Sequence, residues 1–228
     1  MLLAIPDALG TQQLHEVRSL LEAAGDAWVD GRVSAGYQGA PVKRNEQIDE
    51  GSAVAAQCQA LILGALERHP RFISAVLPNE VYPPMFNRYG QGMAFGEHVD
   101  GSVRLHPHTG RKLRTDVSAT LFLNPPDEYE GGELVVHDAF GSHRVKLAAG
   151  HMVVYPATSL HEVTPITRGR RLASFFWIQS LVRDDARRST MFDLDNAIQR
   201  LNQSGADALA RRGLVGVYHN LMRQWSDT

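Results

Sequence analysis

The feature that most restricts the fold of this chain is a central region of short β-prone segments with no helical pattern between them. The region runs from about residue 72 to residue 181, and turn sequences such as Gly131-Gly132 and Ala149-Gly150 separate the segments. The predicted strands are residues 74–77, 84–89, 117–123, 133–137, 143–147, 151–155, 160–163 and 172–178. A series of about eight short strands pairs into a sandwich, a barrel or a jelly roll.

Helical periodicity flanks this region on both sides. Apolar side chains recur at helical spacing over residues 14–24 and 54–65, and these two helices are expected to pack on a sheet as buttresses. The sequence therefore predicts an α+β fold with three parts: an N-terminal helical buttress (1–72), a jelly-roll core (73–181) and a C-terminal helical extension (182–228).

The C-terminal extension contains two further helical patterns, over residues 191–201 and 214–225. The apolar stripe of the second pattern is broad. It either packs on the protein's own sheet or forms a contact between two copies of the chain, so a homodimer through these helices is one of two alternatives.

Composition excludes several classes of partner. The formal net charge of −2 gives no basic surface of the kind that binds nucleic acid. No run approaches about 18 apolar residues, so no membrane span is predicted. The single cysteine, Cys58, cannot form an internal disulfide, which favours a reducing compartment and a cytoplasmic location.

His98 and Asp100 stand at the end of an extended segment, with one valine between them. Residues i and i+2 of an extended chain point to the same side, so an imidazole and a carboxylate face one point. A second histidine would complete the two-histidine, one-carboxylate set of non-haem iron(II) oxygenases. His161, at the start of a later predicted strand, is the candidate.

Arg171 follows His161 by ten positions and opens another predicted strand. A guanidinium group is suited to bidentate capture of a carboxylate. Three protein ligands leave three positions open on an octahedral metal, of which a 2-oxo acid fills two and dioxygen the third. A far carboxylate on that acid would need a cation, and Arg171 would supply it.

Taken jointly, these motifs resemble those of iron(II)/2-oxoglutarate-dependent dioxygenases. The resemblance is to the prolyl 4-hydroxylase-like branch and, within it, to the PKHD-type hydroxylases. It covers about residues 84–178, and it rests on His98-x-Asp100, His161 and Arg171 together with the sequences at 87–90, 116–124, 129–134, 161–165 and 171–177.

The resemblance implies a double-stranded β-helix in which His98, Asp100 and His161 bind Fe(2+) and Arg171 binds the distal carboxylate of 2-oxoglutarate. It also implies that Tyr89 contacts this co-substrate. The implied reaction uses O2 to hydroxylate an unidentified small molecule or peptide, converts 2-oxoglutarate into succinate and carbon dioxide, and relies on L-ascorbate as a reductant.

A strand over residues 117–123 supplies the remaining candidates. Ser118, Thr120 and Phe122 share one face of it, so they are expected to line the pocket, with Ser118 and Thr120 near the co-substrate. Related enzymes often place a tyrosine hydroxyl near the position of Phe122, and a phenylalanine cannot donate that hydrogen bond.

Two other functional classes fit the three candidate ligands. One is a non-enzymatic jelly roll that holds a structural or sensing metal. The other is a cupin-like isomerase or hydrolase that uses zinc or manganese. Formation of succinate that requires iron(II) and dioxygen separates the dioxygenase from both.

Overall fold

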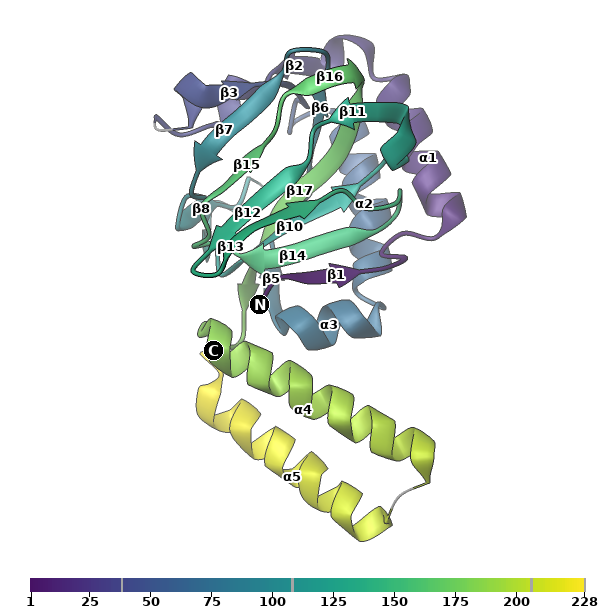
Figure 1. Ribbon diagram of the computed structural model, residues 1–228, viewed down its shortest axis with the longest axis vertical. Helices are drawn as coiled ribbons and strands as arrows, with labels where there is room; N and C mark the ends of the chain where they lie inside the picture. Colours follow the sequence, from purple (N-terminus) through teal and green to yellow (C-terminus); the bar gives the residue numbers. More distant parts are fainter. Residues whose placement is uncertain (38, 108, 206, 228) are drawn as a thin grey trace.

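The computed structural model describes residues 1–37, 39–107, 109–205 and 207–227. Its core is a pair of antiparallel sheets with helices on the outer face of the larger one (Figure 1). The larger sheet has the order β1 (Leu3–Ile5), β14 (Met152–Pro156), β10 (Val117–Phe122), β17 (Arg171–Ser180), β6 (Met85–Tyr89), β4 (Glu46–Ile48) and β2 (Trp28–Asp30), and β5 (Pro78–Val81) also pairs with β17. The predicted α+β jelly roll is confirmed.

The smaller sheet provides the opposite wall of the core. Its strand order is β13 (Gly141–Val145), β12 (Leu134–Asp138), β15 (His161–Val163), β7 (Ala94–His98) and β3 (Lys43–Arg44). Two ribbons extend the sheets, formed by β11 (Tyr129–Gly131) with β16 (Ile166–Gly169) and by β8 (Val103–Leu105) with β9 (Lys112–Arg114). Short 3-10 turns cover Gly25–Ala27, Gly31–Ser34, Ala40–Val42 and Pro126–Glu128.

Three helices form the outer layer: α1 (Thr11–Glu22), α2 (Ala53–Leu66) and α3 (Pro70–Val76). Ser52 caps α2 by accepting a hydrogen bond from the backbone N–H of Ala55. The buried side chains of these helices form one apolar core with the outer face of the larger sheet. This core includes Val17, Leu21, Cys58, Ile62 and Phe72 from the helices and Phe86, Leu121 and Phe176 from the sheet. This core fixes the larger sheet as a rigid platform for the site on its other face.

The predicted strand at residues 74–77 was wrong, because these residues belong largely to α3. Pro70 stands in the first turn of the helix, where its missing N–H is not needed, and His69 accepts a hydrogen bond from the backbone of Phe72. Phe72, Ala75 and Val76 then bury themselves at helical spacing. The structure also differs at the N-terminal region, which contributes strands β1 to β4 to the two sheets besides its helices.

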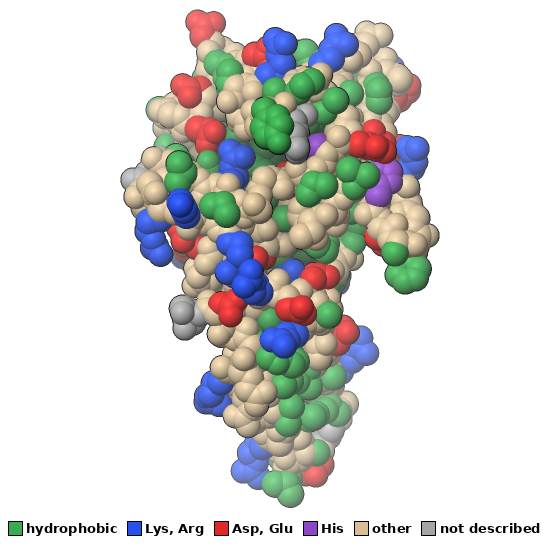
Figure 2. All heavy atoms as spheres, turned by 90° about the vertical axis from the view of Figure 1, so that its left-hand side faces the viewer, with side chains coloured by type: hydrophobic (Ala, Val, Ile, Leu, Met, Phe, Trp, Pro, Cys, Tyr) green, Lys and Arg blue, Asp and Glu red, His purple; other side chains and the backbone are tan. Residues whose placement is uncertain are grey.

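The C-terminal residues form a hairpin of α4 (Asp185–Ser204) and α5 (Ala208–Trp225), which projects away from the sheets (Figure 1). Met191 of α4 is buried against Leu77 and Val182, and part of the apolar stripe of α5 packs on this cluster. Hydrophobic side chains gather along the hairpin surface (Figure 2), and Leu209 of α5 is 69% exposed. A homodimer through this surface stays a prediction.

No helix among the described residues combines the length and apolarity that a membrane span requires.

A second apolar core fills the space between the two sheets, and two glycines allow it to close. Gly131 and Gly132 have φ values of +71° and +64°, in the left-handed region. A Cβ atom on Gly131 would lie 2.0 Å from the carbonyl oxygen of Pro165. The β11–β16 ribbon therefore approaches as closely as it does only because residue 131 has no side chain.

Gly131→Ala is expected to destabilise the protein by at least about 3 kcal/mol, since it adds a backbone clash to the strain of a left-handed alanine. The matched control is Gly92→Ala, because Gly92 has a φ of +76° but no atom within 4 Å of its Cβ position. Gly92→Ala therefore adds only the strain of a left-handed alanine, which should lower the free energy of unfolding by about 1–2 kcal/mol. Urea unfolding of both variants measures the difference, and equal losses would show that the close approach is not required.

Candidate active site

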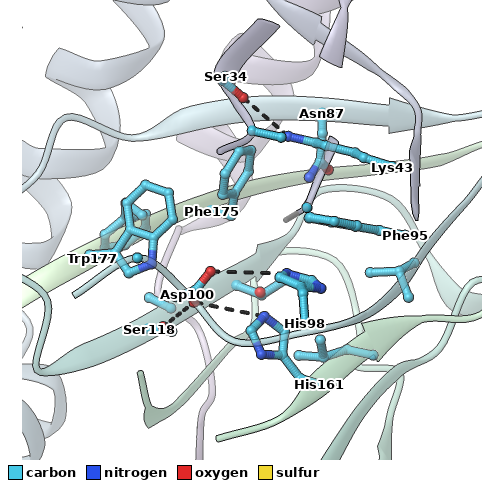
Figure 3. A pocket seen from close by; sticks show the side chains of 18 of the residues that line it. Ser34, Lys43, Asn87, Phe95, His98, Asp100, Ser118, His161, Phe175 and Trp177 are labelled. Atoms are coloured by element: carbon cyan, nitrogen blue, oxygen red, sulfur yellow. Dashed lines mark hydrogen bonds and ion pairs between the residues drawn. The ribbon is translucent and has the colours of Figure 1, made fainter. Parts of the chain in front are cut away.

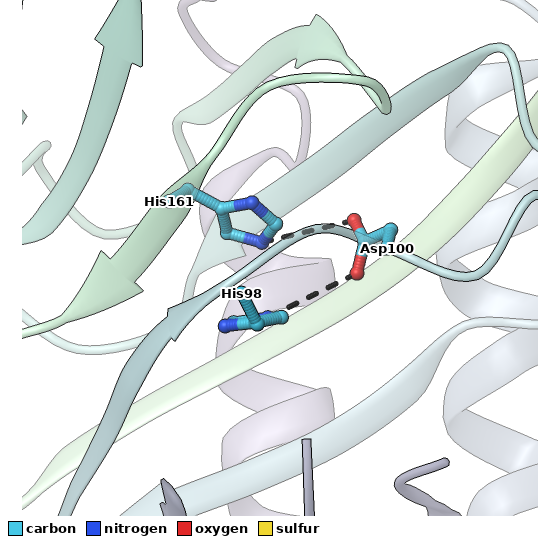
Figure 4. Close-up of side chains that lie close together, drawn as sticks. All are labelled: His98, Asp100 and His161. Atoms are coloured by element: carbon cyan, nitrogen blue, oxygen red, sulfur yellow. Dashed lines mark ion pairs between the residues drawn. The ribbon is translucent and has the colours of Figure 1, made fainter. Parts of the chain in front are cut away.

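The two sheets bring His98, Asp100 and His161 together. His98 ends β7 and lies opposite His161 of the neighbouring strand β15, while Asp100 follows β7 by two residues. One ligand atom from each of the three side chains lies within 4.8 Å of the others. The Nε2 atoms of His98 and His161 lie 4.0 and 3.7 Å from the carboxylate oxygens of Asp100 (Figure 4). The predicted convergence of these three residues is present in the structure.

The hydrogen bonds of the two imidazoles leave Nε2 available on each ring. Nδ1 of His98 lies 2.8 Å from the carbonyl oxygen of Gly96, and Nδ1 of His161 lies 3.0 Å from that of Ser159. A carbonyl oxygen can only accept, so Nδ1 carries the proton in both rings and the lone pair is on Nε2. This is the arrangement that metal-binding histidines adopt.

The electrostatics of this group favour a divalent cation. Burial, and then the neighbouring His161, lower the pKa of His98 to about 4, so its ring is neutral at pH 7. Asp100 accepts a hydrogen bond of 2.6 Å from the hydroxyl of Ser118, which holds the carboxylate in place. Two imidazole nitrogens and one carboxylate oxygen are the donor set expected for non-haem iron(II), so the residues fit this metal.

Arg171 is the second element of the site. It opens β17, is 1% exposed, and has its guanidinium carbon 5.4 Å from the ring centres of both Tyr89 and Phe122. Its hydrogen bond from Nη1 to Asn87 is long at 3.5 Å, and Nε has no partner among the described residues. No carboxylate of the described chain lies within 4.0 Å of it. A buried cation in this condition fits an anionic ligand that enters from the pocket.

One open pocket holds both elements. Ser118 and Thr120 line it, as expected, together with Tyr89 and Tyr155, whereas Phe122 is buried and does not line it. The hydroxyl of Ser118 donates a hydrogen bond to Asp100, and binding of the co-substrate by Ser118 and Thr120 stays a prediction.

Sequence analysis missed two tyrosines near this end of the pocket. Tyr155 lies opposite Ser118 on β14 with its ring centre 5.1 Å from that of His161, and burial raises its pKa well above the usual value. Tyr129 has a buried hydroxyl with no partner among the described residues. Both lie in segments predicted as strand or turn, where only the alternation of side chains indicated an inward direction. They provide hydroxyl donors that Phe122 lacks.

Sequence analysis also missed another wall of the pocket, part of which is shown in Figure 3. This wall contains cationic and aromatic side chains from four separate elements: Lys43, Phe95, Arg104, Phe175 and Trp177.

Ser118→Ala is expected to weaken iron(II) binding about 10- to 100-fold, because Asp100 loses the hydrogen bond that orients it. Ser174→Ala is the matched control, since Ser174 is also buried in the larger sheet but its hydroxyl has no partner among the described residues. Isothermal titration under anaerobic conditions measures both affinities. Equal affinities in the two variants would mean that the Ser118 hydroxyl does not position Asp100.

Comparison with known proteins gives the same assignment over nearly the whole chain. The pattern of the 2OG-Fe(II) oxygenase superfamily matches residues 84–179, and that of the PKHD-type hydroxylase C-terminal domain matches residues 185–227. A PKHD-type hydroxylase of Cupriavidus pinatubonensis is 73% identical over 228 residues, and one of Caulobacter vibrioides is 55% identical; each match covers 100% of both chains.

Solved structures support the fold at low sequence identity. A prolyl-4-hydroxylase of Pseudomonas putida matches with a TM-score of 0.53 and 22% identity, covering 78% of this chain and 92% of that one. A non-heme alpha ketoglutarate dependent carbocyclase from nogalamycin biosynthesis matches with a TM-score of 0.57 and 14% identity, covering 79% and 80%.

The jelly roll and the His-Asp-His group thus define an iron(II)- and 2-oxoglutarate-dependent oxygenase, an oxidoreductase. Within that class, the chain belongs to the PKHD-type hydroxylases.

Proposed function

We propose that this protein hydroxylates a carbon atom of an organic substrate and couples that reaction to oxidative decarboxylation of 2-oxoglutarate to succinate and carbon dioxide. The observation that supports this most is the buried guanidinium of Arg171 in the same pocket as His98, Asp100 and His161. The other two functional classes, a structural metal site and a cupin-like isomerase or hydrolase, give this buried cation no purpose.

Each residue has a distinct task in this proposal. His98, Asp100 and His161 would hold iron(II), which supplies, together with 2-oxoglutarate, the dioxygen activation that hydroxylation of a C–H bond needs. Arg171 binds the distal carboxylate of 2-oxoglutarate, and the rings of Tyr89 and Phe122 keep water from this ion pair. Ser118 fixes the Asp100 carboxylate.

The reaction is tested with the full-length chain, iron(II) and 2-oxoglutarate labelled at the carboxylate beside its keto group. We expect labelled carbon dioxide and an equal amount of succinate, both dependent on iron(II) and on dioxygen. An isomerase or hydrolase would act with zinc or manganese in the absence of dioxygen. Complete absence of succinate from the iron-loaded protein in air, with a range of added organic acids and peptides, contradicts the proposal.

Ascorbate as the reductant and a cytoplasmic location stay predictions. Repeated turnover with and without ascorbate tests the first. If succinate formation slows at the same rate in both samples, ascorbate is not needed.

A further inference from the structure

A buried lysine lines the pocket in addition to the groups described above. Lys43 belongs to β3 at the edge of the smaller sheet, where it pairs with Phe95, and it is 3% exposed. Its Nζ donates a hydrogen bond of 3.1 Å to the hydroxyl of Ser34 and lies 5.1 and 5.7 Å from the ring centres of Phe95 and Phe175. Within the described chain, no carboxylate lies within 4.0 Å of this nitrogen.

An ammonium group buried in this way is costly unless something compensates it. Burial, and then repulsion by Arg104, lower the pKa of Lys43 to about 8, and the attraction of Asp100, Glu50 and Asp30 does not outweigh them. The amine therefore still carries its proton for most of the time at pH 7. A hydroxyl and two aromatic rings solvate this charge, but they do not neutralise it.

Arg104 of β8 is a second cation that lines the same pocket. Its guanidinium carbon lies 4.3 Å from the ring centre of Trp177 and 5.1 Å from that of Tyr82, and no carboxylate of the described residues lies within 4.0 Å. Stacking occupies only the flat face of a guanidinium group and leaves the N–H groups at its edge to interact with oxygen atoms such as that of the Tyr82 hydroxyl. Those N–H groups suit a planar carboxylate.

Lys43 and Arg104 contact aromatic residues that are well separated from Arg171 along β17. Arg171, Phe175 and Trp177 share one face of β17. Lys43 lies over the ring of Phe175 and Arg104 over that of Trp177. The Cα atoms of Phe175 and Trp177 lie about 13 and 20 Å from that of Arg171 along the strand. A five-carbon diacid has only about 5 Å between its ends. A 2-oxoglutarate molecule bound to Arg171 is therefore too short to span these backbone distances. Figure 3 shows Lys43 across the pocket from His98, Asp100 and His161.

The charges at the proposed metal centre balance without these cations. Iron(II) offsets the two charges of 2-oxoglutarate, and Asp100 and Arg171 offset each other. Lys43 and Arg104 are left without an anion once the metal and the co-substrate are bound. A second anionic group is therefore expected in the pocket, and the remaining molecule that binds there is the substrate.

Building on the function proposed above, we propose that the substrate carries a carboxylate group, which Lys43 and Arg104 bind, and an apolar part that lies against Phe95, Phe175 and Trp177. The carboxylate anchors the substrate at one end of the pocket, and its C–H bond faces the His98–Asp100–His161 group. Either a free organic acid or an acidic residue of a peptide provides this chemistry.

The test uses two matched pairs of probes with the full-length chain loaded with manganese(II) and 2-oxoglutarate, which prevents turnover. One pair is 3-phenylpropionate and its amide. The other is an acetylated, amidated Phe-Asp-Phe tripeptide and its Phe-Asn-Phe counterpart. Titration calorimetry of the wild type is expected to show binding of the acid at least about tenfold tighter than its neutral partner in one pair, which also identifies the source of the carboxylate.

Lys43→Met and Arg104→Met are each expected to weaken binding of the preferred acid about 10- to 100-fold while leaving the neutral partner unaffected. Lys112→Met is the matched control, because Lys112 is an exposed cation on β9, in the same ribbon as Arg104. Lys43→Met should also raise the melting temperature, since it removes an uncompensated buried charge. A purely structural lysine would give the opposite change in melting temperature and no change in acid preference.

Absence of an acid preference in both pairs for the wild type would overturn this proposal, as would an unchanged preference in the Lys43→Met and Arg104→Met variants. Failure of the function proposed above gives a different result. If the proposed function is wrong, the manganese-loaded wild type does not bind 2-oxoglutarate at all. If only the proposal of a substrate carboxylate is wrong, the wild type still binds 2-oxoglutarate, and Lys43→Met changes that affinity by less than about twofold.

Discussion

Replacing Asp100 with asparagine is expected to lower succinate formation by roughly three orders of magnitude or more, because the cation loses the single negative charge among its three proposed ligands. Asparagine has nearly the same shape as aspartate, so the change removes charge and little else. The side chain lies close to two imidazoles and accepts a hydrogen bond from the hydroxyl of Ser118. We expect iron(II) affinity to fall together with turnover.

Anaerobic calorimetry with iron(II) measures the affinity, and circular dichroism shows whether the sheets remain intact. Asp127→Asn is the control, since Asp127 is exposed in the 3-10 turn Pro126–Glu128. This substitution removes the same charge, but from the surface of the protein. His98→Ala and His161→Ala should also abolish turnover. Wild-type activity in the Asp100→Asn variant would remove Asp100 from the proposed ligand set.

Arg171→Met should raise the dissociation constant of 2-oxoglutarate by a factor of between about 30 and several thousand, because one carboxylate then enters a buried site without its charged partner. Methionine fills much of the same space between Tyr89 and Phe122. No ion pair is lost within the described chain, so we expect the melting temperature of the ligand-free protein to stay within about five degrees of the wild type.

Calorimetry with the manganese-loaded protein measures this effect apart from turnover. Arg170→Met is the matched control, since Arg170 is the preceding residue on the same strand end but is exposed. A 2-oxoglutarate affinity that is equal in both variants would rule out Arg171 as the carboxylate partner. A large loss of stability in Arg171→Met alone would instead indicate a structural role.

Sequence analysis succeeded where the signal was local. The spacing of His98 and Asp100 fixes their common direction in any extended segment, and β7 is extended up to His98. The polar-apolar texture of the central region also predicted most core strands. The strand prediction failed at residues 74–77, where β-prone side chains follow Pro70, the first residue of a helix. There, burial at helical spacing outweighed intrinsic β propensity.

The contribution of residues 43–47 could not be predicted from the chain alone. Lys43 and Gln47 on short strands, and Asn45 between those strands, are buried while Arg44 is exposed, and this places polar side chains where an apolar face is expected. No motif marks them. Their burial follows from packing of the strands β3 and β4 against β7 and β6, which lie far away in sequence.

The sequence by itself determined the kinds of ligand atom, their spacing along the strands and the class of fold, because these depend on residue identity and on short-range backbone geometry. Only the tertiary structure decided which cations of the pocket have no carboxylate of the described residues within 4.0 Å: Arg171, Lys43 and Arg104. Whether a charge is compensated depends on every group that packs around it, and those groups come from strands far apart along the chain.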